Sequence, residues 1–414
     1  MNSKFWRYFG AAALLATTCV QAKDTWQEVV VAPGDYRVNV TGQARRIHPS
    51  CAFEDGYKFY LKPGNSEKLV VYFNGGGACW NYSTCSTAFG NDPSQATFIP
   101  STNLANNPAT WDGLLAIDNP SNPYKDWTIV FLPYCTGDVF IGAKETVYSN
   151  PQLSPNNAVP DVFTVHHRGF DNFLYVMNYL DSRYRHLDKI LVSGSSAGGY
   201  GSTLNYPWIK KILGRNAKTS LVSDGSIGVL TDEFIQDSLF GTNTSWSIEQ
   251  TLHPALRRLS KVTEGLNFIP SALRILANQY PEDRFSQYTN AYDYVQAIFW
   301  NLMQPIPQPL PDLATWSTRM LEMTVANQTN LPHNYRSYID PGCDHTILSY
   351  SEFYTSALEG ISFLDWIKTQ TGESYSKKHR WRNLSCTLGE NCGEETLTTD
   401  GIEACLNRFY SRLF

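Results

Sequence analysis

The segment KILVSGSSAGGYG, residues 189–201, constrains the fold more than any other part of the chain. It joins a short apolar run to the pattern Gly194-x-Ser196-x-Gly198. In this pattern a serine sits on a sharp turn between a buried strand and a helix, and the residues two positions away must be nearly free of side chain for the turn to close. Such a turn is the nucleophile elbow of α/β hydrolases. The pattern selects Ser196 over Ser195, because Ser195 lacks glycines at those two positions.

Continuous apolar runs elsewhere in the chain are typical of strands that are buried on both faces. They cover residues 69–73, 128–132 and 190–192, with a weaker run at 220–222. Between the second and third runs, residues 170–180 carry apolar side chains at helical spacing. Buried strands that alternate with helices indicate a mostly parallel sheet covered on both faces. We therefore expect an α/β-hydrolase-like three-layer sandwich with a central, mostly parallel sheet.

The N-terminal part and the loops complete the expected organisation. Residues 27–31, 36–40 and 56–61 have the character of short strands between Gly and Pro turns, which predicts an antiparallel start to the sheet. Residues 86–125 are rich in Asn, Pro, Ser and Thr and show little periodicity, so we expect a long loop insertion. The chain has no repeat and no long linker. Residues 23–414 are therefore expected to form a single catalytic domain with a cysteine-containing C-terminal segment.

The first 22 residues have the layout of a secretory signal peptide. Lys4 and Arg7 form a short basic region, an uncharged stretch follows at residues 8–20, and a small-x-small pattern ends at Ala22. Thirteen uncharged residues are too few for a helix that spans a bilayer, and no other stretch approaches the required length. We therefore expect cleavage near Ala22 and secretion to the extracellular space or the periplasm.

The charge of the chain argues against partners that are nucleic acids. The formal net charge is −5. It becomes −7 when Lys4 and Arg7 are removed with the signal. The chain has no basic cluster that would follow a phosphate backbone. At 42% hydrophobic and 17% charged residues, the composition is also that of a folded protein and not of a disordered one.

The cysteines of the mature chain form an even set. One of the nine cysteines, Cys19, lies in the expected signal peptide, which leaves eight. An even number in a secreted chain predicts disulfides, although eight cysteines allow 105 pairings. The chain has neither a CxxC nor an HExxH motif. We therefore expect no metal site, and no cofactor is needed for the chemistry expected of a serine nucleophile.

The glycine run 75–77 is the candidate oxyanion loop. It directly follows the apolar run 69–73. The tetrahedral intermediate of acyl transfer carries a negative oxygen, which backbone N–H groups must reach, and glycines allow such a close approach. The α/β-hydrolase fold takes a second donor from the residue after the nucleophile, which is Ala197 in this chain.

His345 is the candidate general base. The triad order of this fold is Ser, then Asp or Glu, then His, and His345 lies in a tight loop after a predicted strand at residues 335–339. A histidine on such a loop suits proton transfer. Five other histidines fit structural or surface positions better: His166, His167, His253, His333 and His379.

The acid of the triad has several candidates. It usually follows the penultimate strand, and Asp293 comes after a plausible strand at residues 284–290. Asp224 ends an earlier strand and fits a structural turn, but it stays open as an alternative partner of the histidine. Asp344 ranks last, because it would have to fold back onto the adjacent His345.

Four segments of the chain resemble the pectin acetylesterase/Notum family of secreted α/β-hydrolase-type serine esterases. They are NGGGACW at 74–80, GSSAGGYGS at 194–202, AYDYVQ at 291–296 and GCDHTI at 342–347. They occur in order over most of the mature chain. The resemblance implies Ser196 as nucleophile, His345 as base and Asp293 as the acid. It implies oxyanion donors at Gly76, Gly77 and Ala197. It implies a carboxylic ester hydrolase without a metal or organic cofactor.

We add a hypothesis on the disulfides, motivated by the need to hold catalytic groups in place. Cys79 and Cys343 each lie two residues from a candidate site residue. We hypothesise that disulfides hold both loops and that the other four cysteines pair among themselves. The pairs are then Cys79–Cys85, Cys343–Cys405, Cys51–Cys135 and Cys386–Cys392.

The expected function is the hydrolysis of acetyl esters on a polysaccharide such as pectin, through a Ser-His-Asp triad and an acyl-enzyme. One alternative is an esterase, lipase or depolymerase that acts on longer acyl groups or on polyesters. A peptidase with the same triad is another. A catalytically silent binding protein on the same fold is a further one. The sequence leaves the acyl chain length and the oligomeric state open.

Overall fold

The computed structural model describes residues 25–413 except for 41, 55, 91–95, 103–105, 151–158, 242, 243, 332 and 375–380, and it describes side chains as far as residue 408. The expected signal peptide at 1–22 and His379 lie outside the described residues. Among the described residues, no helix is both long enough and apolar enough to cross a membrane.

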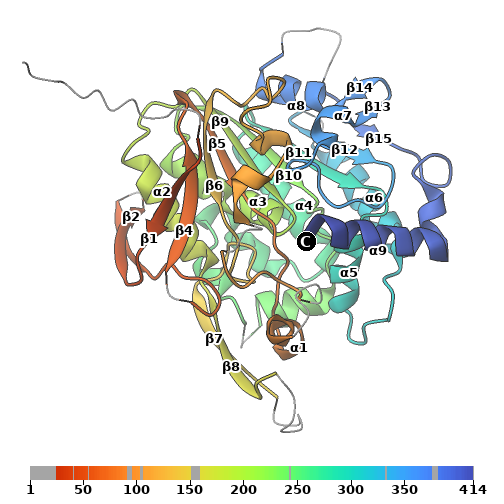
Figure 1. Cartoon of the computed structure of the whole chain (residues 1–414), viewed down its shortest axis with the longest axis horizontal. Helices are drawn as coiled ribbons and strands as arrows, with labels where there is room; N and C mark the ends of the chain where they lie inside the picture. The colour runs from red at the N-terminus through yellow and green to blue at the C-terminus, as the bar shows by residue number, and fades with distance from the viewer. Residues whose placement is uncertain are drawn as a thin grey trace, which may run out of the picture.

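A nine-stranded sheet forms the centre of the molecule (Figure 1). Seven neighbouring strands run parallel, and the two strands at the N-terminal edge join antiparallel. The expected mostly parallel sheet with an antiparallel start is therefore present. In spatial order the strands are β1 (Gln27–Val31), β4 (Tyr57–Lys62), β6 (Trp127–Leu132), β5 (Asn65–Phe73), β9 (Lys189–Ser195), β10 (Lys218–Asp224), β11 (Arg284–Asn290), β12 (Tyr335–Asp340) and β15 (Leu384–Ser385).

The alternation of side chains along β5 shows why its sequence is a continuous apolar run. Leu69, Val71 and Phe73 pack into the core on one face of the sheet. Val70 and Tyr72 pack into a separate core on the opposite face. Successive side chains of a strand point to opposite faces, so a strand covered on both sides must be apolar at every position.

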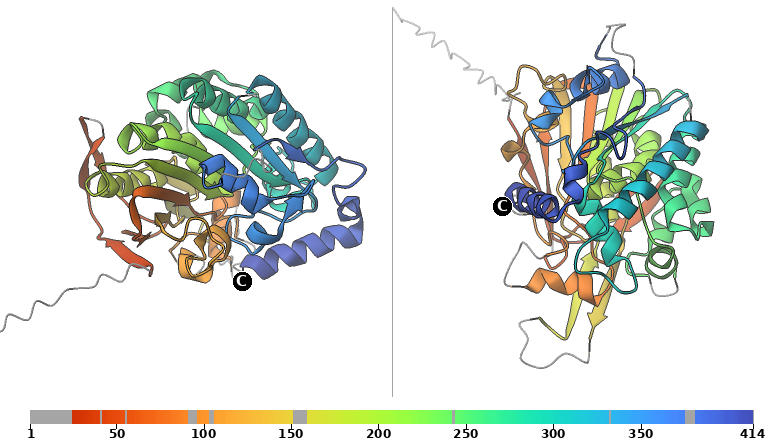
Figure 2. Two further views of the ribbon diagram at one scale, coloured as in Figure 1. Left: turned by 90° about the horizontal axis from the view of Figure 1, so that it is seen from above. Right: turned by 90° about the vertical axis from the view of Figure 1, so that its right-hand side faces the viewer.

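Helices cover both faces of the sheet and make three layers (Figure 2). The larger core contains residues of α2 (Gly169–Asp181), α3 (Ala197–Ile212) and α4 (Gly265–Gln279). The core of the opposite face contains residues of α8 (Phe363–Thr371). The other helices are α1 (Tyr82–Cys85), α5 (Tyr294–Leu302), α6 (Leu313–Asn330), α7 (Glu352–Thr355) and α9 (Thr399–Leu413).

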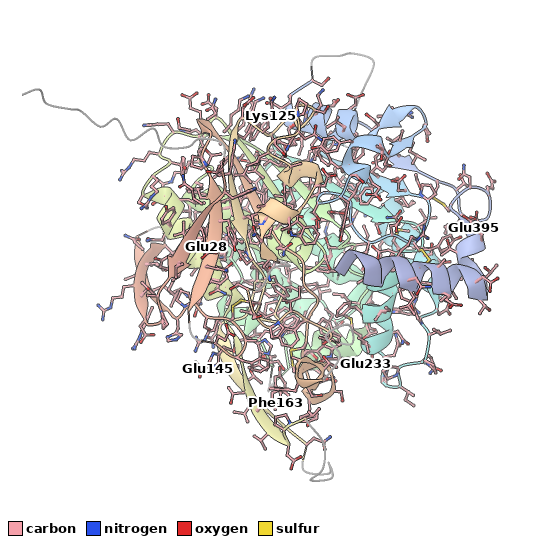
Figure 3. The ribbon with its side chains drawn as sticks, in the orientation of Figure 1. Glu28, Lys125, Glu145, Phe163, Glu233 and Glu395 are labelled. Atoms are coloured by element: carbon pink, nitrogen blue, oxygen red, sulfur yellow. A yellow bond between two sulfur atoms is a disulfide. The ribbon has the colours of Figure 1, made fainter. Side chains whose placement is uncertain are left out.

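Two strand pairs lie outside the central sheet. The expected strand at 36–40, β2 (Tyr36–Val40), does not enter that sheet but pairs with β3 (Gln43–Ile47) and packs on α2. A second hairpin, β7 (Lys144–Ser149) with β8 (Val162–His167), extends beside α1 at the lower end of the molecule in Figure 1. The side chain of Phe163, labelled in Figure 3, contacts the ring of Tyr82 on α1, with 5.4 Å between the ring centroids.

The described residues of the insertion at 86–125, which exclude 91–95 and 103–105, form mainly loops with short helical turns, as expected. The turns are η1 (Ser86–Phe89), η4 (Pro108–Thr110) and η5 (Gly113–Leu115).

The structure contains four disulfides, and they join the same four pairs that we hypothesised. They are Cys51–Cys135, Cys79–Cys85, Cys343–Cys405 and Cys386–Cys392.

Candidate active site

Ser196 sits at the turn between β9 and α3, in a conformation that few residues other than glycine adopt. Its φ and ψ are 57° and −125°. The two glycines of the motif allow this turn. A Cβ on Gly194 would collide with the carbonyl oxygen of Gly198, and a Cβ on Gly198 would collide with that of Phe73. The chain therefore holds Ser196 in a strained turn at the end of a central strand.

Backbone N–H groups of two segments lie beside Ser196. Ala197 is the first residue of α3, where an N–H has no partner within the helix and the helix dipole favours negative charge. The glycine loop follows β5, and a Cβ on Gly75 would lie only 3.0 Å from the Cβ of Ser196. Hydrogen bonds from Ile99 N to the Gly76 carbonyl (2.9 Å) and from Ala78 N to the Thr97 carbonyl (3.0 Å) hold this loop.

His345 is oriented by Asp293. Its Nδ1 lies 2.9 Å from both carboxylate oxygens. Because a carboxylate only accepts hydrogen bonds, Nδ1 carries the proton and Nε2 is left as the acceptor. Among the described residues, Nε2 has no hydrogen-bond partner.

Asp293 is itself held from several sides. The fully buried side chain caps the N-terminus of α5 and accepts from Gln296 N (3.0 Å). It also accepts from Gln296 Nε2 (2.8 Å). The Gln296 side chain in turn accepts from Ile227 N (2.8 Å) and donates to Thr289 Oγ1 (3.0 Å). Gln296 is not among the site residues predicted from the sequence, although an Asp followed three residues later by Gln is a helix-capping pattern.

Asp224 contacts the loop of His345 but not its imidazole. Its carboxylate accepts from Ser195 Oγ (2.7 Å) and from the backbone N–H groups of Ile347 and Leu348. Burial raises the pKa of Asp224 to about 6. Of the candidate acids, Asp293 is therefore the one bonded to Nδ1. Asp344 points elsewhere, with Oδ1 3.8 Å from Arg408 Nε.

The other described histidines take structural or surface positions. His253 caps η8 (Pro254–Lys261), and burial lowers its pKa to about 4. His167 is buried between the Thr136 carbonyl and the Tyr148 hydroxyl, at 2.8 Å from each, and burial lowers its pKa to about 3. Cys79 and Cys85 lie close to His167, but they are joined in a disulfide and offer no thiolate to a metal. His333 is exposed.

A cavity opens at Ser196. Ser196, His345, Gly77 and Ala197 all line it, so the structure brings the candidate nucleophile, the candidate base and two of the oxyanion candidates to one space. The rest of the lining is almost entirely apolar. It consists of Ala78, Trp80, Val139, Ile141, Tyr200, Leu204, Gly225, Leu230, Phe234, Leu239, Trp246, Phe268, Ile269, Val295, Gln296, Phe299 and Met303.

A large part of the apolar wall comes from the chain between β10 and α5. This stretch contributes η6 (Phe234–Leu239), Trp246 and residues of α4, and α5 closes one side. The cavity also follows α3, where Ala197, Tyr200 and Leu204 lie on one face of the helix. At a rise of 1.5 Å per residue, Leu204 lies ~12 Å along the helix from Ser196. The cavity is therefore elongated along α3.

Comparisons with known proteins relate the chain to carboxylic ester hydrolases. The family model described as Pectinacetylesterase matches residues 50–242. Pectin acetylesterase 4 of Arabidopsis thaliana is 27% identical over 358 residues, which are 82% of this chain and 77% of the relative. The palmitoleoyl-protein carboxylesterase notum1a of Danio rerio is 26% identical over 39% of this chain, and the match spans 30% of its own length.

A solved structure shares the fold. The structure of the Wnt deacylase Notum from Drosophila superposes with a TM-score of 0.55 and 18% identity, covering 88% of this chain and 98% of that one. The sequence matches and the shared fold point in the same direction. The chain is similar to the pectin acetylesterase/Notum family of carboxylic ester hydrolases.

Proposed function

We propose that this protein is a serine esterase that cleaves esters of apolar acyl chains longer than acetyl. The observation that carries the proposal is the elongated apolar cavity at Ser196. Its lining is almost entirely apolar and extends along α3 as far as Leu204, which suits an acyl chain that reaches beyond the first carbons. Such a chain gains about 0.8 kcal/mol for each methylene that it buries there.

The proposed reaction passes through an acyl-enzyme. Ser196 Oγ attacks the ester carbonyl and gives its proton to His345 Nε2, while Asp293 holds the imidazole through Nδ1. Backbone N–H groups at Gly76, Gly77 and Ala197 stabilise the tetrahedral oxyanion. The bond to the alcohol oxygen breaks, and His345 protonates that oxygen. Water then attacks the acyl-enzyme, gives a proton to His345, and releases the acid as Ser196 regains its proton.

The triad assignment predicts a large loss of activity in Ser196→Ala. We expect kcat to fall by at least ~10³-fold with an unchanged circular dichroism spectrum, because triad members act as a unit. His345→Ala should lose a comparable amount. The measurement is the initial rate on p-nitrophenyl butyrate per mole of folded protein. Near-wild-type turnover by Ser196→Ala would overturn the assignment.

The acyl preference predicts a rise in kcat/KM with chain length. Two buried methylenes are worth about 1.6 kcal/mol, so the butyrate ester should be hydrolysed with a kcat/KM up to ~15-fold above the acetate ester. A matched variant, Leu204→Phe, narrows the cavity two helical turns from Ser196. It should lower kcat/KM for octanoate while leaving that for acetate within about twofold. A kcat/KM that falls steadily from acetate to octanoate would contradict the proposal.

A second candidate is the deacetylation of a polysaccharide. It is favoured by the relatives, since the one that matches 82% of this chain is named a pectin acetylesterase. Acetate release from acetylated pectin, xylan and chitin, with Ser196→Ala as the control, separates the two candidates.

We also propose that the protein works outside the reducing cytosol, after removal of the signal expected at 1–22. All eight cysteines of the remaining chain are paired. Such pairing is typical of secreted proteins. N-terminal sequencing of the exported protein tests cleavage near Ala22.

A further inference from the structure

Asp224 lies at the carboxyl end of β10, next to the strand that carries the nucleophile. Its backbone carbonyl accepts a hydrogen bond of 2.7 Å from the N–H of Ser196 itself. In the register of the two strands, Asp224 is the partner of Ser195. The backbone of Asp224 is thus hydrogen-bonded to the turn that carries Ser196.

The side chain of Asp224 binds the loop that carries His345. Its two oxygens accept from Ile347 N at 3.1 and 3.0 Å, and one of them accepts from Leu348 N at 2.9 Å. These N–H groups follow His345 by two and three residues. Between them and His345 lies Thr346, whose φ of 68° is uncommon for a β-branched residue. A strained loop keeps one conformation only where its surroundings hold it.

Two buried hydroxyl groups extend the hydrogen-bond network of the Asp224 carboxylate into the sheet. Ser195 Oγ donates to Asp224 Oδ2 at 2.7 Å, and the Tyr72 hydroxyl lies 2.8 Å from Ser195 Oγ. Tyr72 is on β5, the strand that leads into the glycine loop, and all three side chains are buried. The network therefore joins the ends of three neighbouring strands. β5 leads into the glycine loop and β9 into Ser196, while Asp224 at the end of β10 binds the loop of His345 through its side chain.

We propose that Asp224 is a positioning residue that sets the separation between Ser196 and His345. One residue binds the nucleophile's own N–H through its carbonyl and the histidine loop through its carboxylate. It acts on the reaction only through these two segments, since its carboxylate makes no hydrogen bond to the imidazole among the described contacts. The inference rests on the proposed roles of Ser196 and His345.

Asp224→Asn tests the proposal, because asparagine keeps the shape but replaces one acceptor oxygen by an NH₂ donor. At the position of Oδ1 the NH₂ group would face the N–H of Ile347, and at the position of Oδ2 it would replace the acceptor of Leu348 N and Ser195 Oγ, so the loop loses part of its anchor in either orientation. We expect kcat to fall by roughly 10²-fold, the effect of a small displacement of a catalytic group, with KM within about twofold. A role in stability alone would leave kcat per folded molecule unchanged, and that result would overturn the proposal.

Asp283→Asn is the matched control. Asp283 is an equally buried carboxylate that precedes β11 and accepts from Lys210 Nζ (2.9 Å) and the Tyr206 hydroxyl (2.9 Å). It lies at the opposite end of the strands from Asp224. This variant should unfold at a lower temperature than the wild type but keep its kcat. A comparable loss of kcat in both variants would show that any buried carboxylate has this effect, and would contradict a specific role for Asp224.

Two milder variants keep the test decisive if Asp224→Asn does not fold. Ser195→Ala removes one donor to Asp224, and Tyr72→Phe removes the bond one step further away. We expect kcat to decrease in the order wild type, Tyr72→Phe, Ser195→Ala, again with little change in KM. Wild-type kcat in Ser195→Ala would overturn the proposal. If the wild type and Ser196→Ala were equally inactive on every ester, the proposed function itself would have failed, which is a different outcome.

Discussion

Gly198 lies in the turn at Ser196, at a position that has no room for a side chain. A Cβ there would meet the carbonyl oxygens of Phe73 and Asn74, both backbone atoms of the strand end beside the elbow. Backbone atoms cannot move aside as the tip of a flexible side chain can. The glycine is therefore required by close packing between α3 and β5, in addition to the turn itself.

Gly198→Ala is accordingly expected to displace the start of α3. We predict a loss of at least ~2 kcal/mol in the free energy of unfolding, at the upper part of the range for overpacking, together with a fall in kcat. Urea denaturation and ester hydrolysis measure the two effects. Gly90→Ala is the control, since its nearest contact would be the Thr87 carbonyl at 3.2 Å and its φ is −65°. Equal stability of both variants would contradict the packing argument.

The sequence allowed us to predict those residues whose expected role requires a recognisable pattern of neighbouring residues. Ser196 is marked by glycines that the turn requires, and the structure places His345 and Asp293 in contact 2.9 Å apart. The role of Asp224 could not be read in the same way. Its partners, Ile347 and Leu348, lie more than 120 residues away and use backbone N–H groups, which any residue carries.

At the scale of elements, the central strands could be predicted because burial on both faces leaves continuous apolar runs. The hairpin of β7 and β8 could not be predicted so easily. One face of it is buried through Tyr148, Phe163 and Val165, while Val147 and Val162 are exposed at 65% and 59%. Apolar side chains on both faces hide the period of two that marks a half-buried strand. The hairpin is a finding of the structure alone.

His167 joins this hairpin to the loop after β6 and makes its stability depend on pH. Burial lowers the pKa of His167 to about 3, whereas an unfolded histidine has a pKa near 6.5. As the pH falls through this window, the unfolded chain binds a proton that the native state does not bind. The free energy of unfolding must therefore fall on acidification from about pH 6.5 to pH 3.

We predict that His167→Gln weakens this pH dependence. The variant should be less stable than the wild type at pH 7, because it replaces two good hydrogen bonds, yet lose less stability between pH 7 and pH 4. Guanidinium denaturation at both pH values measures the difference. The exposed His333 gives the control, since His333→Gln should keep the wild-type dependence. A parallel loss of stability in His167→Gln and the wild type would disprove the linkage.

At the scale of the whole molecule, the apolar cavity at Ser196 is the feature that the sequence did not predict. Its lining residues run from Gly77 to His345 and come from loops, α3, α4 and α5. Each apolar side chain among them has the same character in the sequence as a side chain of the core. Only the assembled fold separates the residues that surround a space from those that fill one. For this reason the sequence led us to expect an acetyl ester as the substrate, whereas the cavity supports the proposal of longer acyl chains.

The disulfides also follow a rule that is visible only in the whole molecule. In each of the four pairs, one cysteine lies shortly after the carboxyl end of a central strand. Cys79 follows β5, Cys135 follows β6, Cys343 follows β12 and Cys386 follows β15. In a parallel sheet these ends share one edge, which is the edge that carries Ser196 and His345. The covalent bonds therefore reinforce the loops that build the site.

The pair Cys343–Cys405 should contribute most among those that hold the histidine loop, because it closes a long loop in the unfolded chain. Its cysteines are 62 residues apart, whereas those of Cys386–Cys392 are 6 apart. Loop-closure entropy predicts a loss of about 4 kcal/mol on replacing the first pair by serines and about 2 kcal/mol on replacing the second. Urea denaturation measures both, and equal losses would contradict the entropic argument. The first double variant should also lower kcat at a temperature where it remains folded, because Cys343 lies two residues before His345 and ties its loop to α9.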